Sequence, residues 1–420
     1  MRVLIIGAGI GGLATALSLH AAGIDCVLAD SAAELRPLGV GINIQPHAVR
    51  ELTELGLGEA LSTTGIATSV QTYTNRYGQP ILTLPRGRSA GYAWPQYSIH
   101  RGHLQMLMLA AVKERLGPEK VRLSLAFEAF EQDSGSVTAL MRDLRTGRSV
   151  AETGDVLVGA DGLHSTVRRR LHPDDPPLRW SGIRLWRGAV ETVPFLDGST
   201  LLVAGSNLSK KFVAYPISAE AGRRGRALVN WVAELNVAGT GTSWEADWTA
   251  AGALEDVLPH FADWAFPYLD VAGLIENTER ILHYPMVDRD PLPFWGEGRV
   301  TLLGDAAHPM YPIGSNGGSQ AVLDARVLAR ALAGTPNPLK GLSEYEDERL
   351  APTTKLVLAH RELPMDETIK KVDERAPQGF ADIANVLTPA ELAHMSEAQK
   401  RITDMDVAAL NERPSWNVTR

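Results

Sequence analysis

The chain has 420 residues, more than one ordinary domain holds, so its length predicts two globular parts with well-filled cores. Hydrophobic residues make up 45% and charged residues 21%, as in soluble globular proteins. The formal net charge of −8 gives no electrostatic basis for binding nucleic acid, and the short arginine clusters at 168–170 and 223–224 are expected to be solvated or to contact phosphate.

The cysteine content and the N-terminal residues indicate in which cellular compartment the protein is expected. The single cysteine, Cys26, excludes an intrachain disulfide and a cysteine-built metal site, and we expect no metal. The apolar run at 3–6 ends at Gly7, too early for a signal peptide, and no run of eighteen apolar residues could span a membrane. We therefore expect a cytoplasmic protein with no membrane partner.

The first thirty residues predict a strand, a tight glycine turn and a helix. The apolar run 3–6 passes into Gly7-x-Gly9-x-x-Gly12, and apolar residues at helical spacing follow. In a dinucleotide site, Gly7 permits the turn, Gly9 lets a phosphate approach the backbone, and Gly12 lets the helix pack on the strand. The helix N-terminus would then offer its N–H groups to a pyrophosphate. A structural turn that binds no ligand would show the same glycines.

Further positions in the first third of the chain extend this pattern. A second predicted strand, 25–29, ends at Asp30, eighteen residues after the last glycine of the turn, where an acid that binds a ribose is expected. Glycines in the stretch 36–46, Gly41 among them, suggest that backbone passes close to a flat or bulky group. Arg101 precedes a predicted amphipathic helix, which it could simply cap.

Two later buried strands each end in an acid. Apolar residues run without alternation through 156–160, as expected for a strand buried on both faces, and the run stops at Asp161. The run 299–303 is similar and stops at Gly304-Asp305. Acids at the carboxyl ends of buried parallel strands lie where ligands bind in open α/β sheets.

The segment from 176 to about 284 consists of short strand-forming runs and predicts a mainly antiparallel sheet. Six of the nine tryptophans lie in it, which suits an aromatic pocket. We expect Trp186, Tyr215 and Trp231 to line that pocket, although burial in the core of the sheet suits each of them equally well. Residues 67–85 are predicted to form paired strands.

The three blocks that contain glycine and aspartate together resemble the fingerprint of the class A flavoprotein monooxygenases, the para-hydroxybenzoate hydroxylase family. These blocks are Gly7-x-Gly9-x-x-Gly12, Asp161-Gly162 and Gly304-Asp305. The resemblance covers roughly residues 1–365. Within the family, the chain looks most similar to the phenazine-pathway hydroxylases that act on 5-methylphenazine-1-carboxylate, in the stretches 36–46, 95–102 and 284–293.

The resemblance implies an α/β fold in which a Rossmann-like FAD-binding domain carries an inserted, mainly antiparallel substrate sheet and C-terminal helices. The expected domains are a discontinuous FAD-binding domain at 1–66, 95–175 and 285–340, a substrate domain at 67–94 and 176–284, and a C-terminal helical region at 341–420. The oligomeric state would be a monomer or a homodimer.

By this resemblance the cofactor is FAD, and the small-molecule partners are an aromatic substrate, O2 and transient NADPH or NADH. The implied FAD contacts are Gly7, Gly9 and Gly12 at the pyrophosphate, Asp30 at the adenosine ribose, Arg101 at the phosphate or ribityl region, Asp161 at FAD and the nicotinamide, and Asp305 at the ribityl hydroxyls. Most family members have Glu where this chain has Asp30.

The loop 309–318 would lie against the flavin, and the helix after it would point its N–H groups at the ring, where negative charge develops on reduction. Tyr311 and Pro312 would close the substrate pocket. The glycines expected to let backbone approach the flavin are Gly41, Gly314, Gly317 and Gly318. His308 suits a hydrogen-bonded structural role better than that of a base, and we assign no catalytic acid or base. For the segment 309–318, the alternative is an ordinary loop before a helix, with no flavin beside it.

The family reaction implies hydride transfer from NAD(P)H to the flavin, addition of O2 to give a C4a-hydroperoxide, and hydroxylation of an aromatic ring. The substrate would be phenazine-like, or another N-heteroaromatic or phenolic acid. An FAD oxidase or dehydrogenase acting on an aromatic compound, and a non-catalytic FAD-fold protein that binds a partner, remain alternatives. A halogenase is disfavoured because we do not find the motifs of the flavin-dependent halogenases in this sequence. A plain NAD dehydrogenase is disfavoured because it would not explain the late strand that ends at Gly304-Asp305.

Overall fold

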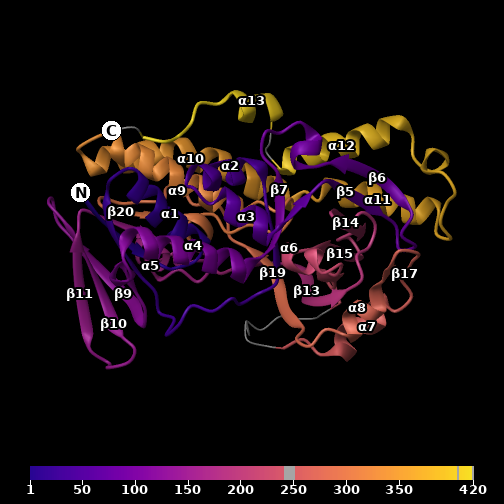
Figure 1. Cartoon of the computed structure of the whole chain (residues 1–420), viewed down its shortest axis with the longest axis horizontal. Coiled ribbons are helices and arrows are strands. Elements are labelled where there is room, and N and C mark those ends of the chain that lie inside the picture. Colours follow the sequence, from indigo (N-terminus) through magenta and orange to yellow (C-terminus); the bar gives the residue numbers. More distant parts are fainter. Residues whose placement is uncertain (241–250, 404–405, 419–420) are drawn as a thin grey trace.

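The computed structural model describes residues 1–240, 251–403 and 406–418, and it shows two lobes that are joined by a small sheet (Figure 1). One lobe is built on a parallel sheet and the other on a larger, mainly antiparallel sheet. Two of the six tryptophans in the tryptophan-rich segment, Trp244 and Trp248, lie outside the described residues.

The parallel sheet forms from the buried apolar runs that the sequence indicates. Its order is β20-β12-β1-β2-β8, and every neighbouring pair is parallel. The strands are β1 (Arg2–Ile6), β2 (Asp25–Ala29), β8 (Val121–Arg122), β12 (Val156–Gly159) and β20 (Val300–Leu302). Strands β1 and β12 show no polar alternation because both faces of the sheet are covered.

Helices cover one face of the parallel sheet, and a three-stranded antiparallel sheet packs on the other (Figure 1). The helices of this lobe are α1 (Ile10–Ala21), α2 (Pro46–Glu54), α3 (Gly58–Thr64), α4 (Arg101–Leu116), α5 (Thr166–Leu171), α9 (Gly317–Ala333) and α10 (Pro338–Arg361). The antiparallel strands are β9 (Leu125–Gln132), β10 (Val137–Asp143) and β11 (Ser149–Gly154). Helix α1 packs between α4 and α9, which fixes the glycine turn that precedes it.

The second lobe is a seven-stranded sheet with the order β19-β13-β16-β15-β14-β5-β6. Only the β14–β5 pair is parallel. The strands are β5 (Val70–Thr74), β6 (Pro80–Pro85), β13 (Arg179–Thr192), β14 (Thr200–Gly205), β15 (Lys210–Pro216), β16 (Ala227–Asn236) and β19 (Leu282–Asp288). The sheet therefore combines the early hairpin with the later tryptophan-rich strands, although about a hundred residues separate them in sequence.

Both faces of this sheet are covered. One face packs on α7 (Leu254–Phe261) and α8 (Val271–Glu276) around an aromatic core. The C-terminal helices α11 (Pro364–Arg375) and α12 (Pro389–Thr403) pack on the opposite face, over β5, β6 and β14 (Figure 1). Residues 341–373, where the sequence indicates helix, form two helices, because α10 ends at Arg361 and Leu363 takes the left-handed conformation, with φ of 48°.

The smallest elements connect the lobes. An antiparallel sheet with the order β3-β7-β4 lies between them, and its strands are β3 (Gly41–Ile44), β4 (Ile66–Thr68) and β7 (Gln96–His100). The remaining α-helices and strands are α6 (Ala219–Arg223), β17 (Ala265–Phe266), β18 (Leu269–Asp270) and α13 (Val407–Glu412). The chain end returns to the first lobe, where Arg50 donates hydrogen bonds to the carbonyl oxygens of Leu410 and Arg413.

Across the described ranges, every helix is too short or too polar to cross a bilayer. The same ranges contain no group of three or more His, Cys, Asp or Glu side chains arranged to hold a metal ion.

Candidate active site

Two cavities bring the predicted site residues together. The larger, of about 550 Å³, lies at the carboxyl ends of β1, β2 and β12. Of the predicted residues, it is lined by Gly7, Gly9, Asp30, Arg101 and Asp161. The smaller, of about 120 Å³, lies against the seven-stranded sheet and is lined by Tyr215, Pro312 and Gly314. The predicted residues that line neither cavity are Gly12, Gly41, Asp305, Gly317, Gly318, Trp186, Trp231 and Tyr311.

The three glycines of the turn meet different steric demands. Gly7 has φ of 107°, which a side chain rarely adopts, and a Cβ on Gly12 would stand 1.9 Å from the carbonyl oxygen of Gly7. A Cβ on Gly9 would meet no atom within 4 Å, because that position faces the larger cavity. Gly9 also precedes α1, whose N-terminus has no side-chain cap, so its N–H groups remain for a ligand.

Asp30 lines the larger cavity but is already hydrogen-bonded. One carboxylate oxygen accepts from the backbone N–H of Ala8 at 2.7 Å, and the other accepts from that of Ala32 at 2.8 Å. Asp30 thus holds the glycine turn in place, a contact that the sequence did not reveal. Each oxygen retains a second lone pair for a ribose hydroxyl.

Asp161 is also occupied within the fold. Its carboxylate accepts from the backbone N–H groups of Thr166 at 2.7 Å and Val167 at 3.2 Å, and from the hydroxyl of Ser165. Burial raises the pKa of Asp161, against the effect of these hydrogen bonds. Because the carboxylate faces the start of α5, Asp161 orients this helix at the cavity wall.

Arg101 and Asp305 form no hydrogen bond or ion pair through their side chains among the described residues, although burial raises the pKa of Asp305 and the charge of Arg101 acts to lower it. Arg101 lines the larger cavity, and its guanidinium forms no hydrogen bond or ion pair with any residue in the described ranges. His100, rather than Arg101, caps α4 by accepting from the backbone N–H of Gly102. The exposed carboxylate of Asp305 likewise has no hydrogen-bond partner among the described residues, and it lies 3.7 Å from the Cβ position of Gly317 at the start of α9.

The resemblance implies that Asp305 accepts hydrogen bonds from the ribityl hydroxyls of FAD. On that expectation, replacing Asp305 by Ala should weaken FAD binding by roughly tenfold without unfolding the protein, because a hydrogen bond to a charged group would be lost at an exposed position. Titration of the apoprotein with FAD by flavin fluorescence measures the change. Asp305→Asn, which retains one acceptor oxygen, should lose less. Unchanged affinity in both variants would contradict a contact between Asp305 and FAD.

The loop between Asp305 and α9 forms part of the smaller cavity. Gly314 and Ser315 both have positive φ, 68° and 59°, so the loop turns sharply there. The side-chain amide of Gln45 donates to the carbonyl of Gly314 at 2.8 Å, and the backbone N–H of Gln45 donates to the hydroxyl of Ser319 at 3.0 Å. These contacts fix the loop against the end of β3.

His308, at the start of this loop, is buried in an ion-pair network. Its Nε2 lies 2.6 Å from a carboxylate oxygen of Asp324, and Arg349 donates to the other oxygen at 2.7 Å. Although burial alone raises the pKa of Asp324, His308 and Arg349 lower it. His308 lies outside the lining of both cavities, which agrees with the structural role expected for it.

An apolar strip forms the floor of the smaller cavity. The strip is made by the directly paired residues Val232 on β16, Val213 on β15 and Val203 on β14. Because neighbouring strands lie about 4.8 Å apart, the three side chains present a nearly flat surface about 10 Å wide. Such a surface suits a planar ring.

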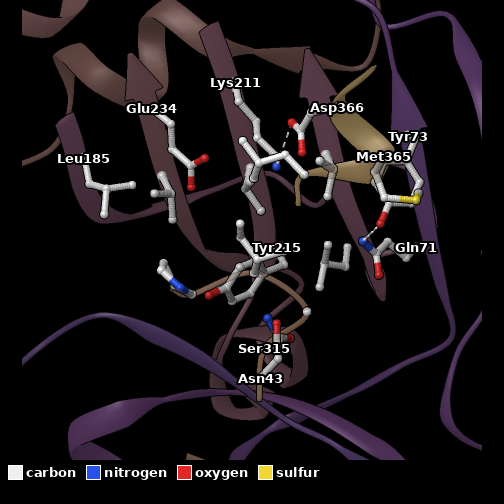
Figure 2. Close-up of a pocket in the computed structure, with 18 of the residues that line it drawn as sticks. Asn43, Gln71, Tyr73, Leu185, Lys211, Tyr215, Glu234, Ser315, Met365 and Asp366 are labelled. Carbon is white, nitrogen blue, oxygen red and sulfur yellow. Dashed lines mark hydrogen bonds and ion pairs between the residues drawn. The ribbon is translucent and has the colours of Figure 1, made fainter. Parts of the chain in front are cut away.

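Polar groups flank this strip on both sides (Figure 2). Figure 2 shows Lys211 and Glu234 at one end of the cavity and Asn43 and Ser315 at the other, with Tyr215 between them. Burial raises the pKa of Tyr215, so its hydroxyl stays protonated and can donate. The end at Asn43 and Ser315 adjoins the loop that is expected to lie along the flavin.

The charged end contains three ionisable side chains. Lys211 and Glu234 are directly paired across β15 and β16, and Lys211 donates to Asp366 on α11 at 3.3 Å. Burial raises the pKa of Glu234, which favours its neutral form, and its Oε2 atom has no hydrogen-bond partner. Burial alone would lower the pKa of Lys211, but the carboxylates of Asp366 and Glu234 raise it.

Arg187 is the second cation of the smaller cavity, and the sequence analysis missed it. It donates to the carbonyl of Gly41 at 2.7 Å, while its Nε is buried without a hydrogen-bond partner. No acid in the described ranges forms an ion pair with it. Gly41 is tightly packed here, since a Cβ would stand 2.7 Å from both Asn230 and Tyr215. Gly41 therefore joins the lobes instead of lining either cavity.

Trp186, Trp231 and Tyr311 are corrections to the predicted pocket. Trp186 and Trp231 are fully buried on the far face of the sheet, in the core with α7 and α8. Successive side chains of a strand point to opposite faces, so the neighbours Leu185, Arg187 and Val232 line the cavity instead. Tyr311 belongs to the loop itself, and its side chain is buried in a cluster with Leu185 and Met286.

The C-terminal helical region supplies cavity residues that no sequence motif indicates. Leu363, Met365 and Asp366 line the smaller cavity from the α10–α11 junction (Figure 2). Only a regular helical pattern marks this segment, and the packing of α11 on the sheet places these residues at the site.

The larger cavity fits a dinucleotide such as FAD. A phosphate can approach at the open position of Gly9, the N-terminus of α1 provides N–H donors, and Arg101 supplies an unpaired positive charge. The unpartnered carboxylate of Asp305 lies beside α9 and can accept from hydroxyl groups.

Comparison with known proteins agrees with this fit. A family model described as FAD binding domain matches residues 1–216 and 281–359. The chain is 51% identical over 362 residues to a phenazine 1,6-dicarboxylic acid hydroxylase of Lysobacter antibioticus, covering 86% of this chain and 89% of that protein. It is 36% identical to a 3-amino-4-hydroxybenzoate 2-monooxygenase of Streptomyces platensis, covering 83% and 84%. The crystal structure of Klebsiella pneumoniae HpxO with FAD and uric acid superposes with a TM-score of 0.75 at 25% identity, covering 96% and 97%.

Proposed function

We propose that the chain hydroxylates a phenazine carboxylic acid with NADPH or NADH and O2. The proposal starts from its family, because the chain belongs to the FAD binding domain family of class A flavoprotein monooxygenases. Its relatives are named hydroxylases and monooxygenases, so the chain is a flavoprotein aromatic hydroxylase with FAD as its cofactor. The apolar strip between the loop at Gly314 and the cation Arg187 is the observation that carries the substrate proposal.

In this proposal the larger cavity holds the dinucleotide part of FAD. Bound FAD would take a hydride from the nicotinamide and activate O2 for transfer to the ring. The residues proposed to hold it are Gly7, Gly9, Gly12, Asp30, Arg101, Asp161 and Asp305, with Gly314, Gly317 and Gly318 near its ring. Asp30 and Asp161 act partly through the backbone they orient, since both carboxylates bind N–H groups of the fold.

The smaller cavity orients the substrate. The aromatic ring lies on the strip of Val232, Val213 and Val203, which excludes water, and the substrate carboxylate binds the unpaired guanidinium of Arg187. The Tyr215 hydroxyl, protonated at neutral pH, donates to a polar atom of the ring. The relative from Lysobacter antibioticus is named for a phenazine substrate, which supports a phenazine as the substrate of this chain. Within that class we propose 5-methylphenazine-1-carboxylate as one candidate.

A monocyclic substrate is the second candidate. The cavity volume of about 120 Å³ is below the usual 300–1,000 Å³ of ligand pockets, which favours a single ring over three. The relatives from Streptomyces platensis are named for a monocyclic aminohydroxybenzoate.

Anaerobic bleaching of the flavin separates these possibilities. We expect NADPH or NADH to reduce the flavin, and phenazine-1-carboxylic acid to accelerate the reduction more than 3-amino-4-hydroxybenzoate does. When the aerobic reaction is run with ¹⁸O2, the product should contain one labelled oxygen atom. The opposite ligand order would favour the monocyclic substrate. An unlabelled product would indicate an oxidase or dehydrogenase, and absence of reduction would contradict the enzyme itself.

A further inference from the structure

The wall of the smaller cavity includes residues beyond the part that matches the family. The family model ends at residue 359, whereas Leu363, Met365 and Asp366 line the cavity. Asp366 is the only ionisable group among these three. Its side chain is 2% exposed, so its charge acts within the protein interior.

Asp366 is held firmly in this position. One of its carboxylate oxygens accepts from the backbone N–H of Asn207 at 2.6 Å, and its carbonyl accepts from the hydroxyl of Ser206 at 3.0 Å. Both partners belong to the turn between β14 and β15. The start of α11 is therefore fixed to the sheet that forms the cavity floor.

Asp366 neutralises one of the two cations in the cavity. Lys211 donates to the same carboxylate oxygen at 3.3 Å, and this is its only ion pair within the described ranges (Figure 2). Lys211 and Asp366 together carry no net charge, and Glu234 beside them adds no positive charge. Arg187 forms no ion pair with a described residue, so among the described lining residues it is the cation that can still provide a counter-charge to an anion.

We propose that Asp366 is a specificity-determining residue that restricts the cavity to aromatic compounds with a single carboxylate. This inference rests on the proposed function, because Arg187 binds that carboxylate. A second carboxylate at the charged end would meet Lys211 already paired with Asp366, and an uncompensated charge in a buried site is unfavourable. A neutral polar group fits this end, since Lys211 has two unused donors and the Oε2 of Glu234 is unpartnered.

The decisive comparison uses phenazine-1-carboxylate and phenazine-1,6-dicarboxylate, titrated into the flavin-loaded protein and followed by the flavin absorbance. The wild type should bind the monocarboxylate more tightly. Asp366→Asn keeps an oxygen for Asn207 and frees the charge of Lys211, so it should shift the preference toward the dicarboxylate by about tenfold or more. Combining Asp366→Asn with Lys211→Met should cancel the shift.

Glu367→Gln provides the matched control, because it removes an acid from the same turn of α11 but at an exposed position. It should leave the preference unchanged. The inference is overturned if the wild type prefers the dicarboxylate, or if folded, flavin-loaded Asp366→Asn keeps the wild-type preference. If neither phenazine binds, the proposed function fails, and the same titrations with benzoate and isophthalate test the role of Asp366 separately.

Discussion

Replacing Gly9 by Val is expected to give a folded protein that purifies without flavin. A Cβ at this position would meet no protein atom within 4 Å, so we expect the fold to tolerate a small side chain here. The same side chain would occupy the space at the N-terminus of α1 where a phosphate must approach. The absorbance of the purified protein near 450 nm and its binding of added FAD measure the effect.

Two other glycines separate loss of binding from loss of folding. Gly12→Ala should destabilise the protein itself, because its Cβ would stand 1.9 Å from the carbonyl oxygen of Gly7. Gly135→Ala, in an exposed turn with only ordinary contacts, should retain both fold and flavin. A Gly9→Val protein that purifies yellow would contradict the placement of the cofactor.

Replacing Arg187 by Met is expected to raise the dissociation constant of the aromatic carboxylate by about 100-fold, because a buried charge pair loses one partner. Binding of uncharged phenazine should change far less, since the apolar strip remains. Titration of flavin-loaded protein with each ligand gives both constants. Arg187 also binds the carbonyl of Gly41, so its loss could shift the backbone there and weaken both ligands. The loss of affinity for the carboxylate beyond that for uncharged phenazine therefore measures the effect of the charge alone.

Arg184→Met is the matched control for this experiment. Arg184 lies on the same strand, β13, but packs over Trp186 on the other face of the sheet. Its loss should leave the affinity for the carboxylate unchanged. Equal losses for the charged and the uncharged phenazine in Arg187→Met would show that Arg187 supports the cavity without binding the carboxylate.

The sequence was most informative where backbone geometry restricts the residue type. The glycine spacing predicted a strand, a turn and a helix because few other residues fit a positive φ at Gly7 or the close contact at Gly12. Acids at strand ends placed Asp30 and Asp161 at the cavity, since parallel strands end at one edge of a sheet. Their hydrogen bonds to the backbone required the tertiary structure.

By itself, the sequence determined the fold class and the family and predicted where the cofactor binds, because local spacing fixes the turns and buried strands that define them. Only the tertiary structure revealed the smaller cavity, where we propose that the substrate binds. Both faces of the second sheet are covered, so the pattern of polar and apolar residues along β13 does not show which face borders the cavity. Because α7 and α8 pack on the face that carries Trp186, the face that carries Arg187 borders the cavity. Asp366 reaches the cavity only because α11 folds back onto that sheet.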